Sequence, residues 1–173
     1  MISETAKPVY LVDAYSDPVV IRIEGRACFL NSACLRDFVT QMIKSGKTRF
    51  VIDFLRCTSM DSTFLGVLAG FALEMLKTKP RGSLVLTRMG QRNLELVRNL
   101  GLHKLLTIDT TDSVATAAPT EAGSTPLVCT DRSELENARM VLEAHENLVS
   151  ADEGNRNKFQ DVLVFMKNRV EQG

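Results

Sequence analysis

The sequence predicts an α/β fold: a mixed β-sheet with helices packed on it, followed by a C-terminal helical hairpin. First, apolar or alternating segments take turns, along residues 8–110, with segments whose apolar residues recur every three or four positions. Second, the segments beyond residue 126 keep only the helical period. Third, 45% of the 173 residues are hydrophobic, which is enough to bury one core.

The sheet is expected to be mixed because its strands are joined in two ways. A turn at Asp17 and Pro18 brings the first two strands together as a hairpin, and Val19, Ile21 and Ile23 give the second strand one buried face. The later strands are separated by helices, so they should pair in parallel through right-handed crossovers. The strands are expected over residues 8–17, 19–29, 50–54, 83–89 and 105–108.

The helices between these strands have caps or breakers at their ends. The second of them has apolar residues nearly all round, so it should be mostly buried. They are expected from Asn31 or Ser32 to Gly46, from Asp61 to about Thr78, and over residues 91–101.

Composition changes after residue 110. Residues 111–126 are rich in Thr, Ala, Ser, Pro and Gly and have no hydrophobic period, which is typical of a linker. Two helices should follow, over 131–149, with a capping box of Asp131 and Glu134, and over 159–170. We expect this hairpin to pack on its own domain; a homodimer or partner contact through it is the alternative. The expected parts are the α/β domain 1–110, the linker 111–126 and the helical extension 127–173.

Charge and hydropathy disfavour two classes of partner. The formal net charge is +0, so no basic field is present to hold a phosphate backbone, and direct nucleic-acid binding is not expected. The longest apolar run, residues 64–76, is too short to cross a bilayer and contains Glu74. The N-terminal residues lack a basic start and an apolar stretch, as a signal peptide would need. We therefore expect a cytoplasmic protein without membrane insertion.

The cysteines and histidines lack the spacing of a metal or redox site. No C-x-x-C pair occurs, and His103 and His145 lie far apart in the chain. We expect the cysteines to be small buried hydrophobes in a reducing compartment, and His145 to be structural. No metal ion or other cofactor is expected. The cysteines are Cys28, Cys34, Cys57 and Cys129.

The most informative polar residues are Asp61, Ser62 and Thr63, at the junction between an apolar strand and an apolar helix. As a nucleophile Ser62 would need a base within reach, and the sequence offers no candidate for that base. Asp61 or Ser62 could simply cap the helix. A third interpretation is a phosphorylation switch, because a helix N-terminus tolerates a phosphate, and the added charge beside Asp61 would repel a partner.

The segment R-C-T-S-M-D-S-T-F-L-G-V-L resembles the signature of STAS domains, specifically the bacterial anti-sigma factor antagonists. Residues 8 to about 110 match the family's order of elements, and R-N-L-G-L-H-K-L-L resembles its closing segment. Two positions depart from the pattern. Phe64 stands where the family usually has glycine, and the loop at 25–33 lacks the acidic residue typical there.

The resemblance implies a non-enzymatic partner switch. The unphosphorylated antagonist binds an anti-sigma factor that is also a serine kinase; phosphorylation by that kinase releases it, and a serine phosphatase resets it. By position Ser62, rather than Thr63, takes the place of the phosphorylated serine. The alternative is a STAS subunit of a transporter, or a scaffold in a sensory complex, without phosphate turnover. The implied partner-binding residues are Asp61, Ser62, Thr63, Phe64, Leu65 and Gly66.

Overall fold

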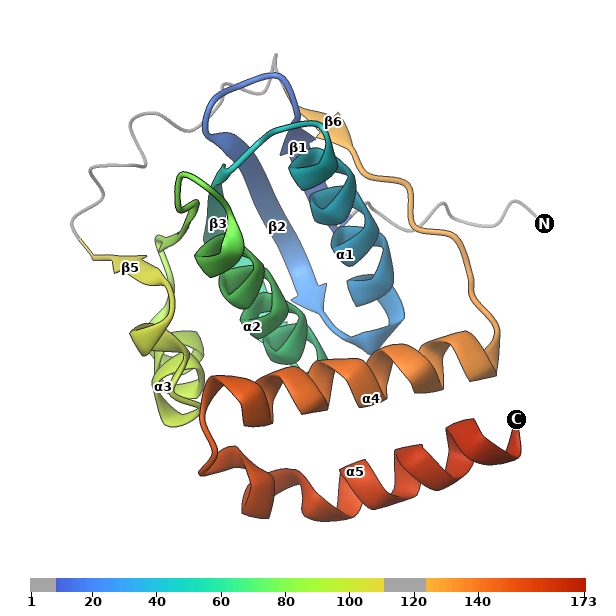
Figure 1. Ribbon diagram of the computed structural model, residues 1–173. Helices are drawn as coiled ribbons and strands as arrows, with labels where there is room; N and C mark the ends of the chain where they lie inside the picture. The colour runs from blue at the N-terminus through green and yellow to red at the C-terminus, as the bar shows by residue number, and fades with distance from the viewer. Residues whose placement is uncertain (1–8, 111–123) are drawn as a thin grey trace.

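The computed structural model describes residues 9–110 and 124–173 and has one six-stranded sheet in the order β5-β4-β3-β2-β1-β6 (Figure 1). The hairpin of β1 and β2 is antiparallel, and β2, β3, β4 and β5 are parallel neighbours. The expected mixed sheet is therefore confirmed. The strands are β1 (Tyr10–Asp13), β2 (Val19–Ala27), β3 (Arg49–Met60), β4 (Ser83–Thr87), β5 (Thr107–Asp109) and β6 (Thr125–Pro126).

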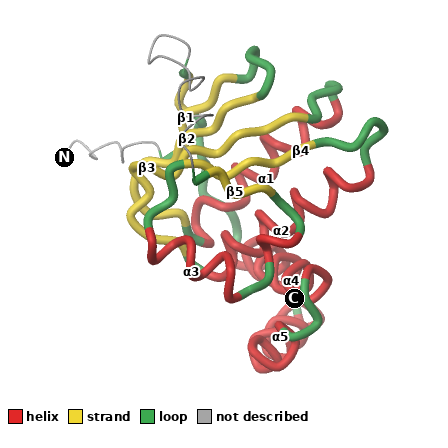
Figure 2. The backbone as a smooth tube through the Cα atoms, turned by 90° about the vertical axis from the view of Figure 1, so that its left-hand side faces the viewer, coloured by secondary structure: helices red, strands yellow, loops and turns green. Residues whose placement is uncertain are grey.

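The helices form layers beneath the sheet. Helices α1 and α2 pack on the sheet, α4 packs across them, and α5 lies outside α4 (Figures 1 and 2). The expected buried face of β2 is confirmed, since Val19, Ile21 and Ile23 are fully buried. The helices are α1 (Phe29–Lys44), α2 (Ser62–Lys77), α3 (Gln91–Asn99), the short 3₁₀ helix η1 (Leu102–Lys104), α4 (Glu134–Ala151) and α5 (Asn155–Gln172).

Strand β3 is longer than the sequence pattern predicts. The expected strand ended at Phe54, but the observed strand continues to Met60. Its second half is more polar and partly exposed, yet it stays paired with the end of β2, where Ala27 lies opposite Met60. The parallel pairing, rather than apolar residues, extends this strand. As a result β3 delivers Asp61 to the start of α1 as well as to the start of α2.

Two helix starts differ from the prediction. Helix α1 begins at Phe29, after Cys28, and the expected cap Asn31 lies in its first turn, where its Oδ1 accepts the backbone N–H of Cys28 at 3.0 Å. Helix α4 is capped by Ser133, whose hydroxyl accepts the N–H of Glu136 at 3.1 Å, and not by Asp131. At α4 several polar residues near the start compete for the cap position, and the incoming chain selects Ser133. At α1 the cap position falls on Cys28, ahead of both expected polar caps.

The end of the expected linker belongs to the sheet. Residues 125–126 form β6, which pairs with β1 through Leu11 and Val12. A two-residue strand is too short to show a hydrophobic period, so it could not be predicted within the linker-like composition of 111–126. The linker residues 111–123 lie outside the described residues.

One pair of cysteines contradicts the expectation of four reduced thiols. Cys34 of α1 and Cys129, in the segment before α4, form a disulfide with Cα atoms 5.3 Å apart. The two residues are 95 positions apart in the sequence, so no local spacing of cysteines could predict the pair. Cys28 is a buried free thiol and Cys57 a half-buried one.

The C-terminal hairpin packs on its own domain through α4. Met140, Ala144 and Leu148 of α4 join the core formed by the sheet and α2. Helix α5 packs on α4 and is otherwise exposed, apart from Asn155 at its start. The preferred expectation for the hairpin is therefore confirmed for α4. Among the described residues, no helix has the length and apolar content needed to cross a membrane.

Candidate functional site

Asp61 caps two helices at once. Its Oδ1 accepts the N–H of Phe64 at 2.9 Å, in the first turn of α2, and its Oδ2 accepts the N–H of Phe29 at 2.8 Å, in the first turn of α1. The N–H of Asp61 in turn donates to the carbonyl of Ala27 at 3.1 Å. A carboxylate at two helix N-termini is favoured by both sets of free N–H groups and by both helix dipoles. The capping role considered for Asp61 is confirmed.

Ser62 is the first residue of α2, and its hydroxyl is already in contact with the C-terminal hairpin. The Oγ of Ser62 lies 2.9 Å from Nε2 of His145 on α4. The other ring nitrogen, Nδ1, lies 2.7 Å from the carbonyl oxygen of Val141. Because a carbonyl can only accept, Nδ1 carries a proton, so in the neutral ring Nε2 accepts the Ser62 hydroxyl.

His145 corrects one statement made from the sequence. The sequence offered no base near Ser62, but His145 is within hydrogen-bond reach of it from 83 positions away. The ring is 2% exposed and also contacts the ring of Phe159, with centroids 5.0 Å apart. A lone histidine on a predicted amphipathic helix gives no sign of its partner, since only the packing of α4 on α2 creates the contact.

Helix α4 approaches α2 closely at two glycines. A Cβ added at Gly66 would lie 2.2 Å from the carbonyl oxygen of Ala144, and one added at Gly70 would lie 2.6 Å from Nδ2 of Asn147. Real Cβ atoms do not come so near to backbone, so the contact at Gly66 is fixed, whereas the Asn147 amide at Gly70 is the end of a flexible side chain that can move. The two glycines, one helical turn apart, therefore form the surface of α2 on which α4 lies.

The remaining predicted site residues lie inside the domain. Thr63, Phe64 and Leu65 are buried, whereas Asp61 and Ser62 are half-buried. The Phe64 ring packs edge-to-face on Phe54, with centroids 6.4 Å apart and planes at 75°. Phe64 thus fills the core under β3. In this arrangement only Asp61 and Ser62 of the predicted set have side chains near the surface.

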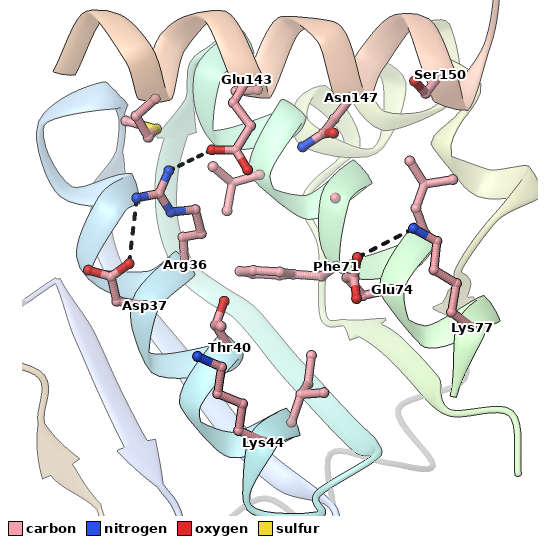
Figure 3. A pocket seen from close by; sticks show the side chains of 16 residues that line it. Arg36, Asp37, Thr40, Lys44, Phe71, Glu74, Lys77, Glu143, Asn147 and Ser150 are labelled. Atoms are coloured by element: carbon pink, nitrogen blue, oxygen red, sulfur yellow. Dashed lines mark hydrogen bonds and ion pairs between the residues drawn. The ribbon is translucent and has the colours of Figure 1, made fainter. Parts of the chain in front are cut away.

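A groove of about 730 Å³ runs beside this contact, between α1, α2 and α4 (Figure 3). Val67 and Phe71 lie along α2, and charged side chains stand at the edges. Arg36 of α1 bridges to Glu143 of α4 at 2.8 Å across one end. Neither Ser62 nor His145 lines this groove. The groove therefore gives no substrate access to the Ser62 hydroxyl.

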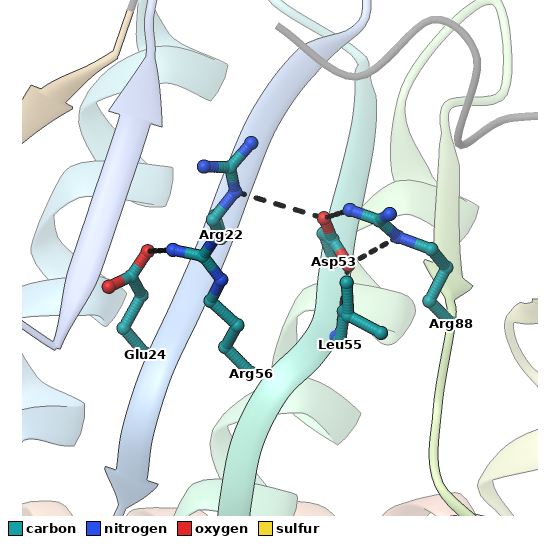
Figure 4. Close-up of polar contacts among 6 residues, drawn as sticks. All are labelled: Arg22, Glu24, Asp53, Leu55, Arg56 and Arg88. Atoms are coloured by element: carbon teal, nitrogen blue, oxygen red, sulfur yellow. Dashed lines mark hydrogen bonds and ion pairs between the residues drawn. The ribbon is translucent and has the colours of Figure 1, made fainter. Parts of the chain in front are cut away.

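A second polar cluster lies on the strands themselves and serves the fold (Figure 4). Asp53 of β3 is 1% exposed, and Arg88, after β4, donates to it with Nε at 3.0 Å and also with Nη2. Arg22 of β2 is a further ion partner at 3.8 Å. A paired, hydrogen-bonded carboxylate of this kind costs little to bury as long as its partners stay. The cluster ties β2, β3 and the end of β4 together.

The comparisons with known proteins agree with this geometry. The sequence model of the family described as "Mlab, STAS domain" matches residues 11–107, which is more than half of the chain. The chain therefore belongs to the STAS domain family. None of the curated proteins matches it.

Two solved structures share the fold. One is described as the anti-sigma factor antagonist SpoIIAA in its unphosphorylated form, with 22% identity and a TM-score of 0.51. It is covered over 94% of its own length by 62% of this chain. The other is the Bacillus cell fate determinant SpoIIAA in the phosphorylated form, with 20% identity, a TM-score of 0.51, and coverage of 97% of that chain and 62% of this one. At these identities the likeness establishes the fold.

Proposed function

We propose that this STAS protein is an anti-sigma factor antagonist whose partner binding is controlled by phosphorylation of Ser62. The observation that carries the proposal is the place of the Ser62 hydroxyl, on the first residue of α2 directly after β3. Free N–H groups and the positive end of the helix dipole favour a negative group there. The existence of a phosphorylated form of a protein with this fold supports the proposal.

Ser62 is preferred over Thr63 as the acceptor because of access. The Ser62 side chain is half-buried, whereas Thr63 is 5% exposed. A kinase must bring the γ-phosphate of ATP in line with the hydroxyl oxygen. A residue inside the domain cannot meet this requirement without unfolding of the helix start.

The proposed partner of the unphosphorylated form is an anti-sigma factor that is also a serine kinase. The kinase transfers the γ-phosphoryl group of ATP to the Ser62 oxygen, ADP leaves, and the hydroxyl proton is lost. The phosphate adds about 1.5 to 2 negative charges next to the Asp61 carboxylate. Like charge and desolvation then release the kinase, and a serine phosphatase restores the hydroxyl. In this cycle the chain is the substrate and performs no catalysis of its own.

Mass spectrometry of the protein from its native cells, at rest and under stress, tests the proposal. We expect a phosphate on Ser62 whose occupancy changes with condition. Ser62→Ala should keep the fold and lock the partner-binding form, and Ser62→Asp should weaken binding of the kinase. If no condition yields phosphate on Ser62 or Thr63, the switch does not operate here.

A second candidate is a STAS subunit of a transporter, or a scaffold in a sensory complex, without phosphate turnover. The observation in its favour is that the Ser62 hydroxyl is engaged by His145, as a fixed contact would be. Co-purification with an ATP-driven permease, together with an unmodified Ser62, would select this candidate over the first.

The setting that we propose is the cytoplasm, where ATP supplies the phosphate; in that reducing compartment the Cys34–Cys129 bond forms only when the local redox state allows it. We propose no direct contact with nucleic acid and no bound cofactor. The alternative of a homodimer through the C-terminal helices has one surface to support it: Val164 and Phe165 of α5 are 55% and 66% exposed. Large apolar side chains exposed side by side favour self-association.

A further inference from the structure

The C-terminal hairpin lies beyond the part of the chain that matches the family. The family match ends at residue 107, and 62% of this chain covers 94% and 97% of the two SpoIIAA chains. The family match thus ends before α4 begins. Helix α4 therefore lies on a surface of α2 that the shorter relatives of this fold do not cover with such a helix.

The surface under α4 is the one on which the proposed switch depends. His145 holds the Ser62 hydroxyl at 2.9 Å, and the carbonyl of Ala144 leaves no room for even a methyl group at Gly66. A partner that binds the start of α2 needs the Ser62 hydroxyl and the surface at Gly66 to be uncovered. Helix α4 and an external partner consequently cannot occupy this surface together.

The contact combines a buried apolar part, formed by Met140, Ala144 and Leu148 of α4, with a polar part at its edges. A groove of about 730 Å³ separates part of α4 from α1 and α2. The bridges from α1 to the tail, Arg36 to Glu143 at 2.8 Å and Asp37 to Arg132 at 2.5 Å, are solvent-exposed and so contribute little each. At Ser62 the contact between the side chains is one hydrogen bond, to His145.

We propose that the α4–α5 hairpin is an intramolecular cover that competes with the external partner, the serine kinase, for the start of α2. This inference rests on the proposed function, since it names the regulation of the same site. Because the cover is part of the same chain, its effective concentration is high, and only the open fraction of molecules binds a partner. Any event that detaches α4 raises the apparent affinity for the partner and exposes Ser62 to phosphorylation.

Thiol labelling of the full chain tests the cover without a partner. Ser62→Cys places a thiol under α4, and Ala69→Cys, made separately, places one at a fully buried position of α2. Each protein is labelled with N-ethylmaleimide without reductant, and the rate at each site is read by peptide mass spectrometry. The native Cys57 thiol reacts slowly near neutral pH because burial raises its pKa to about 11.

The decisive comparison uses Ala144→Arg, which puts a long charged side chain between α4 and Gly66. We expect this substitution to accelerate labelling of the Ser62→Cys protein at least tenfold and to leave the Ala69→Cys protein unchanged. Ser150→Arg adds the same charge at an exposed position of α4 and should change neither rate. If Ala144→Arg abolishes the fold by circular dichroism, Leu148→Ala, buried on the same face one turn later, takes its place.

Two results would overturn the cover. Equal acceleration at both sites means that α4 leaves only when the whole domain unfolds, and no acceleration at either site means that α4 does not protect Ser62. Neither result depends on phosphate, so the cover and the proposed switch can fail separately. If Ser62 is phosphorylated in cells but labelling accelerates equally at both sites, only the proposed cover is refuted. If α4 detaches but Ser62 is never phosphorylated, only the proposed switch is refuted.

Discussion

At the scale of single residues, the contacts of Asp61 explain why an aspartate stands at this junction, whether or not Ser62 is phosphorylated. One carboxylate satisfies N–H groups at the starts of two helices and is held by the pairing of its own N–H with Ala27. The same carboxylate is the neighbour that would make a Ser62 phosphate strongly repulsive. Under the proposed switch, Asp61 would thus have a regulatory role in addition to its observed capping role.

Replacing Asp61 should cost the protein two caps. We expect Asp61→Ala to lower the free energy of unfolding by about 2–3 kcal/mol, since each lost cap typically costs about 1 kcal/mol or more. Asp61→Asn keeps one acceptor oxygen and turns an NH2 donor toward the other N–H, so it should lose one cap and cost at least half as much. Urea denaturation followed by circular dichroism measures both, and an unchanged midpoint for Asp61→Ala would show that the caps contribute nothing.

The ion cluster around Asp53 gives a matched pair of arginine substitutions. Arg88→Ala removes the bidentate partner of a carboxylate that is 1% exposed, so we expect a loss of about 3 kcal/mol. Arg56→Ala removes an exposed partner of Glu24 at 3.1 Å and should cost less than about 1 kcal/mol. Chemical denaturation of the two variants compares the costs directly. Equal costs would mean that burial of Asp53 is irrelevant to the strength of its pairing.

The Cys57 thiol should report its environment through pH. Because burial raises its pKa to about 11, the reactive thiolate is scarce at pH 8 and grows about tenfold with each pH unit towards that value. We expect the alkylation rate of Cys57 in the folded protein to rise accordingly between pH 8 and 10. A rate that levels off near pH 9, as for an ordinary thiol, would contradict the raised pKa.

At the scale of elements, the entry into α4 is fixed by the disulfide between Cys34 and Cys129. The bond anchors the segment before α4 to α1, and the turn after α4 is held by Asn155, whose amide donates to the carbonyls of Leu100 and Leu148 at 2.9 and 2.7 Å. Helix α4 is therefore tied to the domain at both ends, which directs it across the start of α2. This tethering keeps a detached cover close to its site.

Loss of the disulfide should weaken the tether. We expect Cys129→Ser to lower stability by up to about 4 kcal/mol without reductant, because the bond closes a long loop of the unfolded chain. With dithiothreitol present, the wild type and the variant should melt together. A difference that persists in the reduced proteins would assign the effect to the side chain at position 129 rather than to the bond.

At the scale of the whole molecule, the hairpin leaves the protein with one covered surface and one open one. Helix α4 packs on α2, whereas Val164 and Phe165 of α5 are exposed. The alternative of a partner or dimer contact through the C-terminal helices is therefore restricted to α5.

Self-association through α5 should depend on Phe165. We expect the wild type to dimerise at high concentration in analytical ultracentrifugation, and Phe165→Asp to shift it to monomer because a charge at an apolar contact is costly to bury. Asn168→Asp introduces the same charge at another exposed position of α5 and should leave association intact. A wild type that stays monomeric at every concentration would end the homodimer proposal.

The sequence by itself determined the order of the elements and the place of the junction. Alternation in residues 19–23 and the helical periods predicted the mixed sheet and its helices, and Asp61 capped α2 as its position before an apolar helix indicated. These features follow from contacts between near neighbours in the chain, and such contacts leave a period or a cap in the sequence. The STAS resemblance rested on the same local segment and is confirmed.

Only the tertiary structure decided what lies against that junction. Four features join segments that share no sequence pattern. They are the contact of Ser62 with His145, the disulfide between cysteines 95 positions apart, the close approach at Gly66 and the burial of Phe64. The first three depend on where α4 and the segment before it dock, and the burial of Phe64 depends on how α2 packs under β3. Such packing is set by the shape of buried surfaces instead of by any local repeat. A histidine, two cysteines and a glycine are common residues whose meaning appears only when the fold brings them together.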